Sequence, residues 1–334
     1  MKRILCFGEC LLRFSPELGG NWLAQSMMPV YIGGAELNTA SALAKWGMPV
    51  AYCSTLPDNY LSAEICDELR NRTINLDRLF FSGSRIGNYY LPQGADLKNA
   101  GVIYDRAFSS FSELQPGRID WDDVLQDVSW FHFSAISPAL NQHVADVCKE
   151  AVAAASKRKI TISIDLNYRS RLWQYGKQPE EVMRPLVDYC EVIMGNIWSA
   201  GDLLGIRADA GIHEKKSRSA YLAHATKTAD AIMHAFPATK SVANTFRFDG
   251  SGTTSYYAAL DTNGRQYVSR QFSTGTVVDK VGSGDCFMAA LIYGLHNKLP
   301  FQDIIEFAAA AAFDKLFIKG DSTTSTVEDI KGRL

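Results

Sequence analysis

The chain has 334 residues, enough for one large domain with insertions or for two domains. Its 34 basic and 36 acidic side chains give a formal net charge of −2, which argues against the strongly basic face of a nucleic-acid-binding protein. We expect no membrane span, since no run approaches the roughly 20 apolar residues needed. A start that soon turns polar is unlike a signal peptide, and seven scattered cysteines without a C-x-x-C pair indicate reduced thiols in a cytoplasmic protein.

Strands and helices alternate along most of the chain. Residues 3–7 predict a first buried strand that ends at Gly8-Glu9, and a strand near 31–33 leads through Gly33-Gly34 into a helix. The further strands are expected at 50–55, 130–133, 160–164, 191–194, 240–246, 253–259 and 266–272. The helices are expected at 35–46, 61–72, 142–156, 179–188, 198–204, 217–236, 286–293 and 301–318.

This repeated β-α-β order predicts an α/β fold with a mostly parallel sheet and helices on both faces. Such sheets bind ligands beyond the carboxyl ends of their strands. The polar and glycine residues expected at that edge are Gly8, Glu9, Gly33, Gly34, Asp165, Asn167, Asn196 and the loop 279–285. We predict one domain over residues 1–334. Two extended, turn-rich segments, about 10–32 and 84–107, are expected to form a small β lid.

The most informative stretch is Asp279-Lys280-Val281-Gly282-Ser283-Gly284-Asp285, followed by an apolar run. Gly282 and Gly284 would allow positive φ and a close approach to a ligand. A glycine turn at a helix start offers unpaired N–H groups and the positive end of the dipole to an anion. Asp285 could either cap the helix or act as a base beside that anion.

Several other chemistries lack their motifs in this sequence. There is no G-x-x-x-x-G-K-[ST], no G-x-G-x-x-G after the first strand and no G-x-S-x-G. The six histidines are isolated and lack the spacing of zinc ligands. The pattern therefore favours phosphoryl transfer without a P-loop, which needs an anion hole, a base and a metal-bound nucleotide.

The D-x-V-G-x-G-D pattern at 279–285 resembles the C-terminal signature of the ribokinase/PfkB family of carbohydrate kinases. Residues 33–40, Gly-Gly-Ala-Glu-Leu-Asn-Thr-Ala, resemble the family's N-terminal double-glycine motif. The resemblance runs over nearly the whole chain. It implies a ribokinase-like three-layer fold with a β lid and an ATP-dependent kinase.

The resemblance also assigns roles to individual residues. It makes Asp285 the catalytic base and the amides of Gly282, Ser283 and Gly284 the anion hole. ATP and Mg²⁺ would be the cofactors, and a monovalent cation is left open. The residues expected near the nucleotide are Asn196, Asp279, Gly282, Gly284, Ala309 and Gly320. No residue is assigned to the metal.

Within the family the chain looks most like 2-keto-3-deoxygluconate kinases, which make the 6-phosphate. Three stretches carry this similarity, at 33–38, 102–107 and 165–173. Guanidinium groups bind carboxylates with paired hydrogen bonds, so Arg106 and Arg169 are expected to hold the acid group of the substrate. The other residues expected to bind substrate are Gly33, Gly34, Asn38, Tyr89, Tyr104 and Asn167.

Two alternatives stay open. One is a fructokinase- or ribokinase-like kinase of a neutral sugar. The other is a sugar-acid-binding protein with weakened catalysis, because Asn196-Ile197-Trp198-Ser199 lacks the family's acid after asparagine and the next acid is Asp202. Lys280 and the tail at 321–324 also depart from the usual pattern. The exposed edges of a β lid predict a homodimer or higher oligomer.

Overall fold

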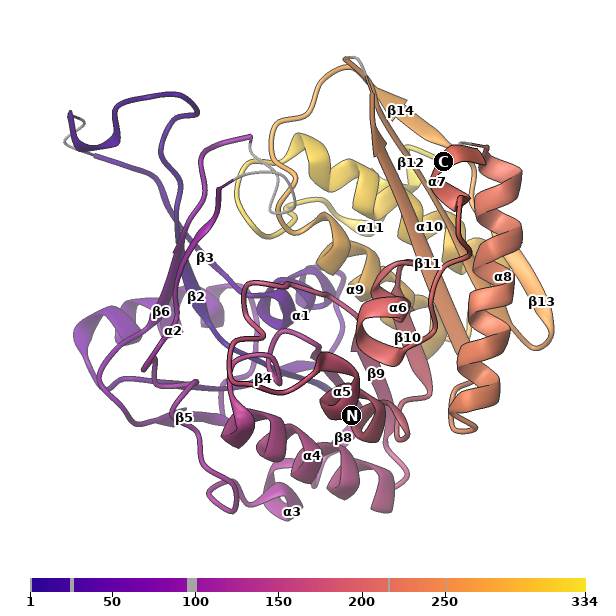
Figure 1. The fold of residues 1–334 in the computed structure, drawn as a ribbon. Helices are drawn as coiled ribbons and strands as arrows, with labels where there is room; N and C mark the ends of the chain where they lie inside the picture. The colour runs from indigo at the N-terminus through magenta and orange to yellow at the C-terminus, as the bar shows by residue number, and fades with distance from the viewer. Residues whose placement is uncertain (1, 25–26, 95–100, 216, 251) are drawn as a thin grey trace.

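A computed structural model describes residues 2–24, 27–94, 101–215, 217–250 and 252–334 (Figure 1). Residues 25–26 and 95–100 of the two expected lid segments lie outside the described residues.

A sheet of ten strands forms the centre of the described structure, with nine of them in the order β13-β12-β11-β10-β9-β8-β1-β4-β5. The strands from β5 to β11 are all parallel, whereas β12, β13 and β14 are antiparallel to their neighbours. The bounds are β1 Arg3–Phe7, β4 Val50–Leu56, β5 Leu79–Phe81, β8 Val128–Ser134, β9 Thr161–Asp165, β10 Val192–Gly195, β11 Ser241–Asp249, β12 Thr254–Thr262, β13 Arg265–Val268 and β14 Phe272–Thr274. The mostly parallel sheet expected from the sequence is confirmed.

Helices cover both faces of this sheet and bury a separate apolar core on each (Figure 1). One face carries α1 Ala35–Lys45, α2 Tyr60–Asn71, α9 Ser283–His296, α10 Phe301–Asp314 and α11 Val327–Lys331. The other carries α3 Trp121–Val124, α4 Gln142–Lys157, α5 Pro179–Val187, α6 Ser199–Leu204 and α8 Arg218–Ala235, with the short α7 Ile212–Lys215 beside α8. The central sheet and the helical layer on each of its faces make this a three-layer α/β fold. None of the described helices is both long and apolar enough to span a membrane.

Two elements differ from the expectations. The strand expected at 266–272 is split into β13 and β14, because these pair with separate stretches of β12. The helix expected at 301–318 ends at Asp314 and continues as the 3-10 turn Lys315–Phe317. There the carbonyl of Leu316 accepts the amide of Val278 at 2.8 Å, a bond to another segment.

The extended segments around residues 10–32 and 84–107 form a second, four-stranded sheet in the order β3-β2-β6-β7. Its strands are β2 Leu11–Phe14, β3 Val30–Gly33, β6 Gly87–Tyr90 and β7 Ile103–Asp105, with the 3-10 turn Trp22–Ala24 before β3. The sheet projects from the main body at the upper left of Figure 1. At its base, Leu11, Tyr89 and Val102 pack against Val281, next to the glycine turn.

Candidate active site

A cavity of about 480 Å³ lies where the carboxyl ends of β9, β10 and β11 meet the second sheet and the glycine turn. It is the place that the strand order predicts for a ligand. The residues of the sequence-based site that line it are Gly34, Asn38, Tyr89, Tyr104, Arg106, Asn167, Arg169, Asn196, Gly282, Ser283, Gly284 and Asp285. Gly34 and Gly284, which are 250 positions apart in sequence, thus line the same cavity.

The glycine turn begins helix α9 at Gly282, whose φ of 81° is left-handed. A Cβ added to Gly282 would lie 1.8 Å from the carbonyl oxygen of Asp321, so no other residue fits there without a shift of the backbone. The expectation of positive φ at Gly284 is wrong, because Gly284 already belongs to the first helical turn. Of these two glycines, Gly282 is the one that the backbone geometry requires.

The N-terminus of α9 faces the cavity with the first helical amides. Hydrogen bonding within the helix starts when Cys286 N–H donates to the carbonyl of Gly282 at 2.8 Å, so the four preceding N–H groups have no partner in the helix. The hydroxyl of Ser283 donates to the carbonyl of Ala312 at 2.8 Å and therefore does not cap its own helix. Free amides and the helix dipole together suit a phosphoryl group or another anion.

Asp285 lies on the cavity wall with 9% of its surface exposed. The Asn38 amide donates to its Oδ2 at 2.7 Å, from the neighbouring helix α1. The pKa of Asp285 is raised to about 8, chiefly by burial; the Asn38 bond and Arg169 act to lower this pKa, and Asp165 and Glu36 act to raise it. A carboxyl group with a pKa near neutral pH is suited to exchange a proton with a substrate hydroxyl. Asn38, expected to bind sugar hydroxyls, is thus already bonded to the candidate base.

Arg106 is held in place by a buried carboxylate that the sequence left without a role. Its Nε donates to Oε2 of Glu9 at 2.6 Å, and the Ser109 hydroxyl donates to Oε1 of the same carboxylate. Both charged side chains are nearly fully buried. Because a guanidinium has five N–H donors, this pair fixes the orientation of Arg106 and leaves further donors on the group that lines the cavity.

Arg169 is half-buried on the loop after β9, and its Nη1 donates to the carbonyl of Tyr168 at 3.1 Å. Three more basic residues, Arg171, Arg247 and Lys280, line the same cavity, and the sequence analysis gave none of them a place in the site. Arg171 comes from the stretch already singled out at 165–173. The cavity is therefore more basic than the motifs alone predict, which suits a substrate and a nucleotide that both carry negative charge.

Asn196 lies at the end of β10 and uses its side-chain carbonyl to start helix α6. Oδ1 accepts the amides of Trp198 and Ser199 at 3.0 and 2.9 Å. Helix α6 then carries Asp202 to the same cavity, where burial raises the pKa of its carboxyl. Position 199, where the family pattern has an acid, is a serine in this chain, and Asp202 supplies a carboxylate one turn later in the same helix.

Four residues of the sequence-based site do not line the cavity. Ala309 is fully buried in the core of α10, because that helix packs on α9. Asp279 and Gly320 lie behind the glycine turn, where Gly320 N–H donates to Asp279 Oδ2 at 3.1 Å. Gly33 packs against the same region, and a Cβ there would lie 2.3 Å from Asp321 Oδ2.

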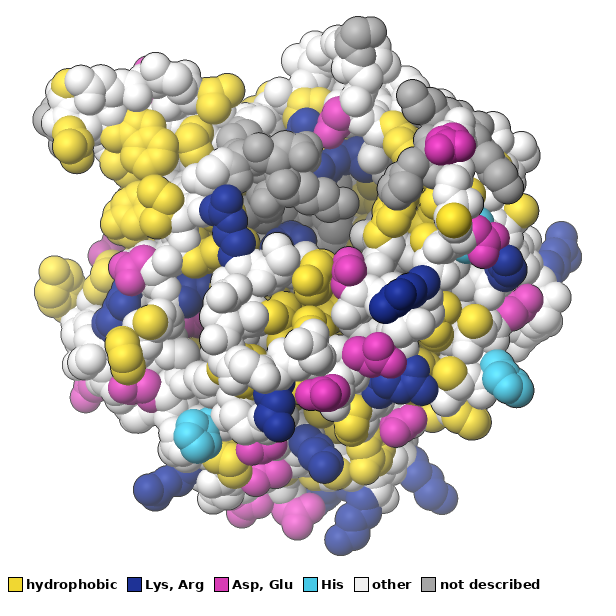
Figure 2. Space-filling view, viewed as in Figure 1, with side chains coloured by type: hydrophobic (Ala, Val, Ile, Leu, Met, Phe, Trp, Pro, Cys, Tyr) yellow, Lys and Arg dark blue, Asp and Glu magenta, His cyan; other side chains and the backbone are white. Residues whose placement is uncertain are grey.

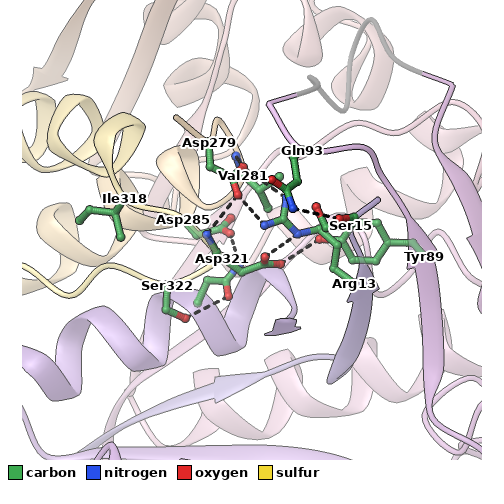
Figure 3. A network of polar contacts seen from close by, with 12 residues as sticks. Arg13, Ser15, Tyr89, Gln93, Asp279, Val281, Asp285, Ile318, Asp321 and Ser322 are labelled. Carbon is green, nitrogen blue, oxygen red and sulfur yellow. Dashed lines mark hydrogen bonds and ion pairs between the residues drawn. The ribbon is translucent and has the colours of Figure 1, made fainter. Parts of the chain in front are cut away.

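Asp279 belongs to a buried network that joins the second sheet to the turn (Figure 3). Arg13 on β2 lies between Asp279 and Asp321, and the Tyr89 hydroxyl on β6 donates to Asp321 Oδ2 at 2.9 Å. The sequence analysis missed Arg13, and it noted Asp321 only as part of the tail that departs from the usual pattern. The signal for Arg13 is a lone charged residue inside the apolar strand Leu-Leu-Arg-Phe, since arginine is rarely buried without a partner.

Known proteins resemble the chain over its whole length. A 2-dehydro-3-deoxygluconokinase structure from Thermotoga maritima superposes with a TM-score of 0.90 at 33% identity, covering 100% of this chain and 99% of the other. A 2-dehydro-3-deoxygalactonokinase of Haloferax volcanii is 28% identical over 98% of this chain and 95% of its own length. A probable fructokinase of Arabidopsis thaliana is 25% identical over 89% of this chain and 71% of its own length.

The family model for pfkB family carbohydrate kinases matches residues 1–324, which include both glycine motifs and the cavity between them. The chain belongs to the pfkB family of carbohydrate kinases.

Proposed function

We propose that the chain transfers the γ-phosphoryl group of ATP to a hydroxyl of a 2-keto-3-deoxy sugar acid, with 2-keto-3-deoxygluconate and its 6-phosphate as the first candidates. The position of Asp285 carries the proposal, because its carboxylate lies on the cavity wall beside the N-terminus of α9. The similarity to a 2-dehydro-3-deoxygluconokinase and a 2-dehydro-3-deoxygalactonokinase supports the same class of substrate.

In this mechanism Asp285 Oδ1 accepts the proton of the substrate hydroxyl, while Asn38 holds Oδ2 at 2.7 Å. The first amides of α9, from Gly282 to Asp285, donate to the oxygens of the transferred group as charge develops there. Because both functions come from consecutive residues of one turn, the attacking hydroxyl and the phosphoryl group would meet at a fixed distance.

Magnesium bound with the nucleotide would neutralise phosphate charge during the transfer. The described residues contain no group of three or more His, Cys, Asp or Glu side chains that could cage a metal. Mg²⁺ fits this arrangement, since it retains several waters and binds through one or two protein oxygens and the substrate phosphates. Asp202 is the residue that we assign to this role, because it lines the cavity.

The basic residues of the cavity account for an acidic substrate. Arg169 would bind the carboxylate of the sugar acid, with Arg106 held by Glu9 as the second guanidinium. Tyr89 and Tyr104, whose ring centroids are 6.5 Å apart, would cover the sugar from the second sheet, which then acts as a lid.

A coupled assay of ADP release over a panel of keto-acids, aldonates and neutral sugars tests this proposal. We expect a 2-keto-3-deoxy acid to be the best substrate, and Arg169→Ala to raise its KM at least tenfold. Arg158→Ala removes an exposed arginine that pairs with Asp122 and does not line the cavity, and it is the matched control. Preference for fructose or ribose, with KM unchanged in Arg169→Ala, would favour the neutral-sugar kinase instead.

The third hypothesis, a sugar-acid-binding protein with weakened catalysis, gives a different result in the same assay. It predicts measurable binding of a sugar acid without ADP release above background. This hypothesis was based on the missing acid after Asn196. Asp202 lines the cavity and supplies a carboxylate there, so the reason for the hypothesis is weaker.

We also propose that two copies associate through the lid. Large apolar side chains are strongly exposed there, with Leu18, Leu23 and Met27 at 68%, 98% and 86% of their surface. Figure 2 shows hydrophobic side chains gathered on the projecting part of the molecule at the upper left. A second copy suits this surface because β3 and β7 are the edge strands of the lid sheet and can pair with another edge.

All seven cysteines are free and buried, which fits reduced thiols and supports a cytoplasmic location.

A further inference from the structure

Four charged side chains are buried together directly behind the glycine turn. They are Arg13, Asp279, Lys315 and Asp321, which are between 0% and 3% exposed. They come from four separate parts of the chain, namely β2, the loop before α9, the 3-10 turn after α10 and the C-terminal loop. Two positive and two negative charges make the cluster neutral as a whole, so its members can remain ionised away from water.

Arg13 connects the two carboxylates. Its Nη1 and Nη2 donate to the two oxygens of Asp279 at 3.2 and 2.6 Å, and its Nε lies 2.7 Å from Asp321 Oδ1 (Figure 3). Burial alone would lower the pKa of the Arg13 guanidinium, but Asp321 and Asp279 outweigh burial and raise that pKa. The guanidinium therefore stays charged.

Asp279 in turn fixes the backbone on both sides of the turn. Oδ1 also accepts the amide of Val281 at 3.1 Å, and Oδ2 accepts the amide of Gly320 at 3.1 Å. Each carboxylate oxygen thus has one guanidinium donor and one backbone donor. The position of Gly282, the next residue after Val281, depends on this arrangement.

Lys315 also lies next to the turn. A Cβ on Gly282 would lie 3.3 Å from Lys315 Cε, and the ammonium donates to the carbonyl of Ile318 at 2.9 Å. Burial lowers the pKa of Lys315, and the nearby Asp279 and Asp321 act against that effect. A compact cation is therefore already present among the oxygen atoms behind the anion-binding turn.

We infer that Arg13 and Lys315 are built-in counter-ions that position the anion-binding turn, so that phosphoryl transfer by this chain does not require a bound monovalent cation. A monovalent ion needs several oxygen ligands, whereas the carboxylates here already pair with the guanidinium and lie near enough to the ammonium to act on its pKa. A further positive charge would leave the cluster unbalanced and buried. The monovalent cation that the family resemblance left open thus does not fit the residues behind the turn.

The inference rests on sugar-kinase activity and not on the identity of the sugar. The purified chain is assayed with ATP, Mg²⁺ and its best sugar substrate while choline is replaced by K⁺, Na⁺ or NH₄⁺ at constant ionic strength. We expect kcat to stay within about twofold throughout. Saturable activation of more than fivefold by one of these ions would overturn the inference.

Lys315→Ala tests the role of the ammonium directly. We expect kcat to fall at least tenfold with a smaller change in sugar KM, and K⁺ or NH₄⁺ to restore several-fold activity by entering the space left by the side chain. Lys331→Ala, which removes an exposed lysine of α11, should change neither kcat nor its ion dependence. Unchanged kcat in Lys315→Ala, or a loss of kcat that neither ion reverses in a folded variant, would contradict the role of a counter-ion.

Two further measurements test the inference if Lys315→Ala does not fold or if the proposed sugar acid is not phosphorylated. Lys315→Met preserves the volume of the side chain and should show the fall in kcat without rescue by ions. The melting temperature of the unaltered chain needs no sugar, and we expect it not to depend on which of the four cations is present at constant ionic strength. Stabilisation by K⁺ alone would count against the inference even if the proposed sugar acid were not phosphorylated.

Discussion

The two sides of the glycine turn differ in how their buried charges are balanced. Behind the turn, Asp279 and Asp321 face Arg13 and Lys315, and the four charges balance. On the cavity side, Asp285 accepts a hydrogen bond from the Asn38 amide and has other carboxylates nearby, and its pKa is raised to about 8, chiefly by burial. The difference indicates that the supporting side is built for rigidity, whereas the reacting side keeps a carboxylate that readily takes up a proton.

The largest expected effect comes from removing the carboxylate on the cavity side. Asp285→Asn should lower turnover by roughly 10²–10⁴-fold, the usual contribution of a positioned base, with little change in substrate binding. Steady-state kinetics and a binding titration check this together. Turnover within tenfold of the unaltered enzyme would remove Asp285 from the role of base.

The same variant should be more stable than the unaltered chain. Since the pKa of Asp285 is higher in the folded than in the unfolded state, the folded state of the unaltered chain loses stability as pH rises through about 8 and the buried carboxyl ionises. The gain in melting temperature from Asp285→Asn should therefore be larger at pH 9 than at pH 5. An equal difference at both pH values would show that the carboxyl is not perturbed by burial.

The second expected effect tests the link between the two sides. Gly282→Ala must place a Cβ 1.8 Å from the Asp321 carbonyl at a φ of 81°, so the turn has to move. A displacement of this size at reacting groups lowers turnover by about 10²-fold, and the strain lowers the melting temperature. Gly284→Ala is the matched comparison for stability, because its Cβ would meet Met194 Cε at an ordinary 3.8 Å. Equal melting temperatures for the two variants would contradict the assigned geometry.

A smaller effect is expected from the hydrogen bond of Asn38. The bond from its amide lowers the pKa of Asp285, so Asn38→Ser should move the midpoint of the rising limb of the kcat/KM profile to higher pH. At pH well above that midpoint, the rate should approach that of the unaltered enzyme. A profile that keeps its midpoint while falling uniformly would mean that Asn38 acts on the sugar alone.

The smallest effect concerns the lid surface far from the turn. Leu23→Asp places a charge on a side chain that is 98% exposed, so it should leave folding intact but separate two copies that meet there. Light scattering should show a monomer, with kcat within about twofold. A monomeric unaltered chain would refute the proposed association.

The sequence predicted the layers and the cavity side well for a physical reason. The alternation of strands and helices fixes which polar residues meet at the carboxyl edge, and the motif from Asp279 to Asp285 keeps base and anion hole within one turn. The spacing of residues along the chain is therefore enough to predict the layers and the cavity side of the turn. Local spacing is a poor guide at Gly284, because a glycine there fits both a turn with positive φ and the first turn of a helix. The structure has the helix.

The side behind the turn was not predictable from local patterns. Arg13 and Asp279 are 266 residues apart, and neither spacing nor composition pairs them. Lys315 sits at the end of an Ala-rich helix that the sequence extends to residue 318, so its burial becomes evident only in the fold. Ala309 was placed near the nucleotide by resemblance alone, and the packing of α10 on α9 puts it in the core instead.

The pH dependence of kcat/KM for the best sugar acid, measured in parallel for the unaltered chain and Asp285→Asn, tests the central claim most directly. A buried carboxylate base predicts a rate that rises with pH to a midpoint near 8 in the unaltered chain, and a residual rate without that limb in the variant. The same profile in both proteins, or a flat profile from pH 6 to 9 in the unaltered chain, would contradict proton removal by Asp285.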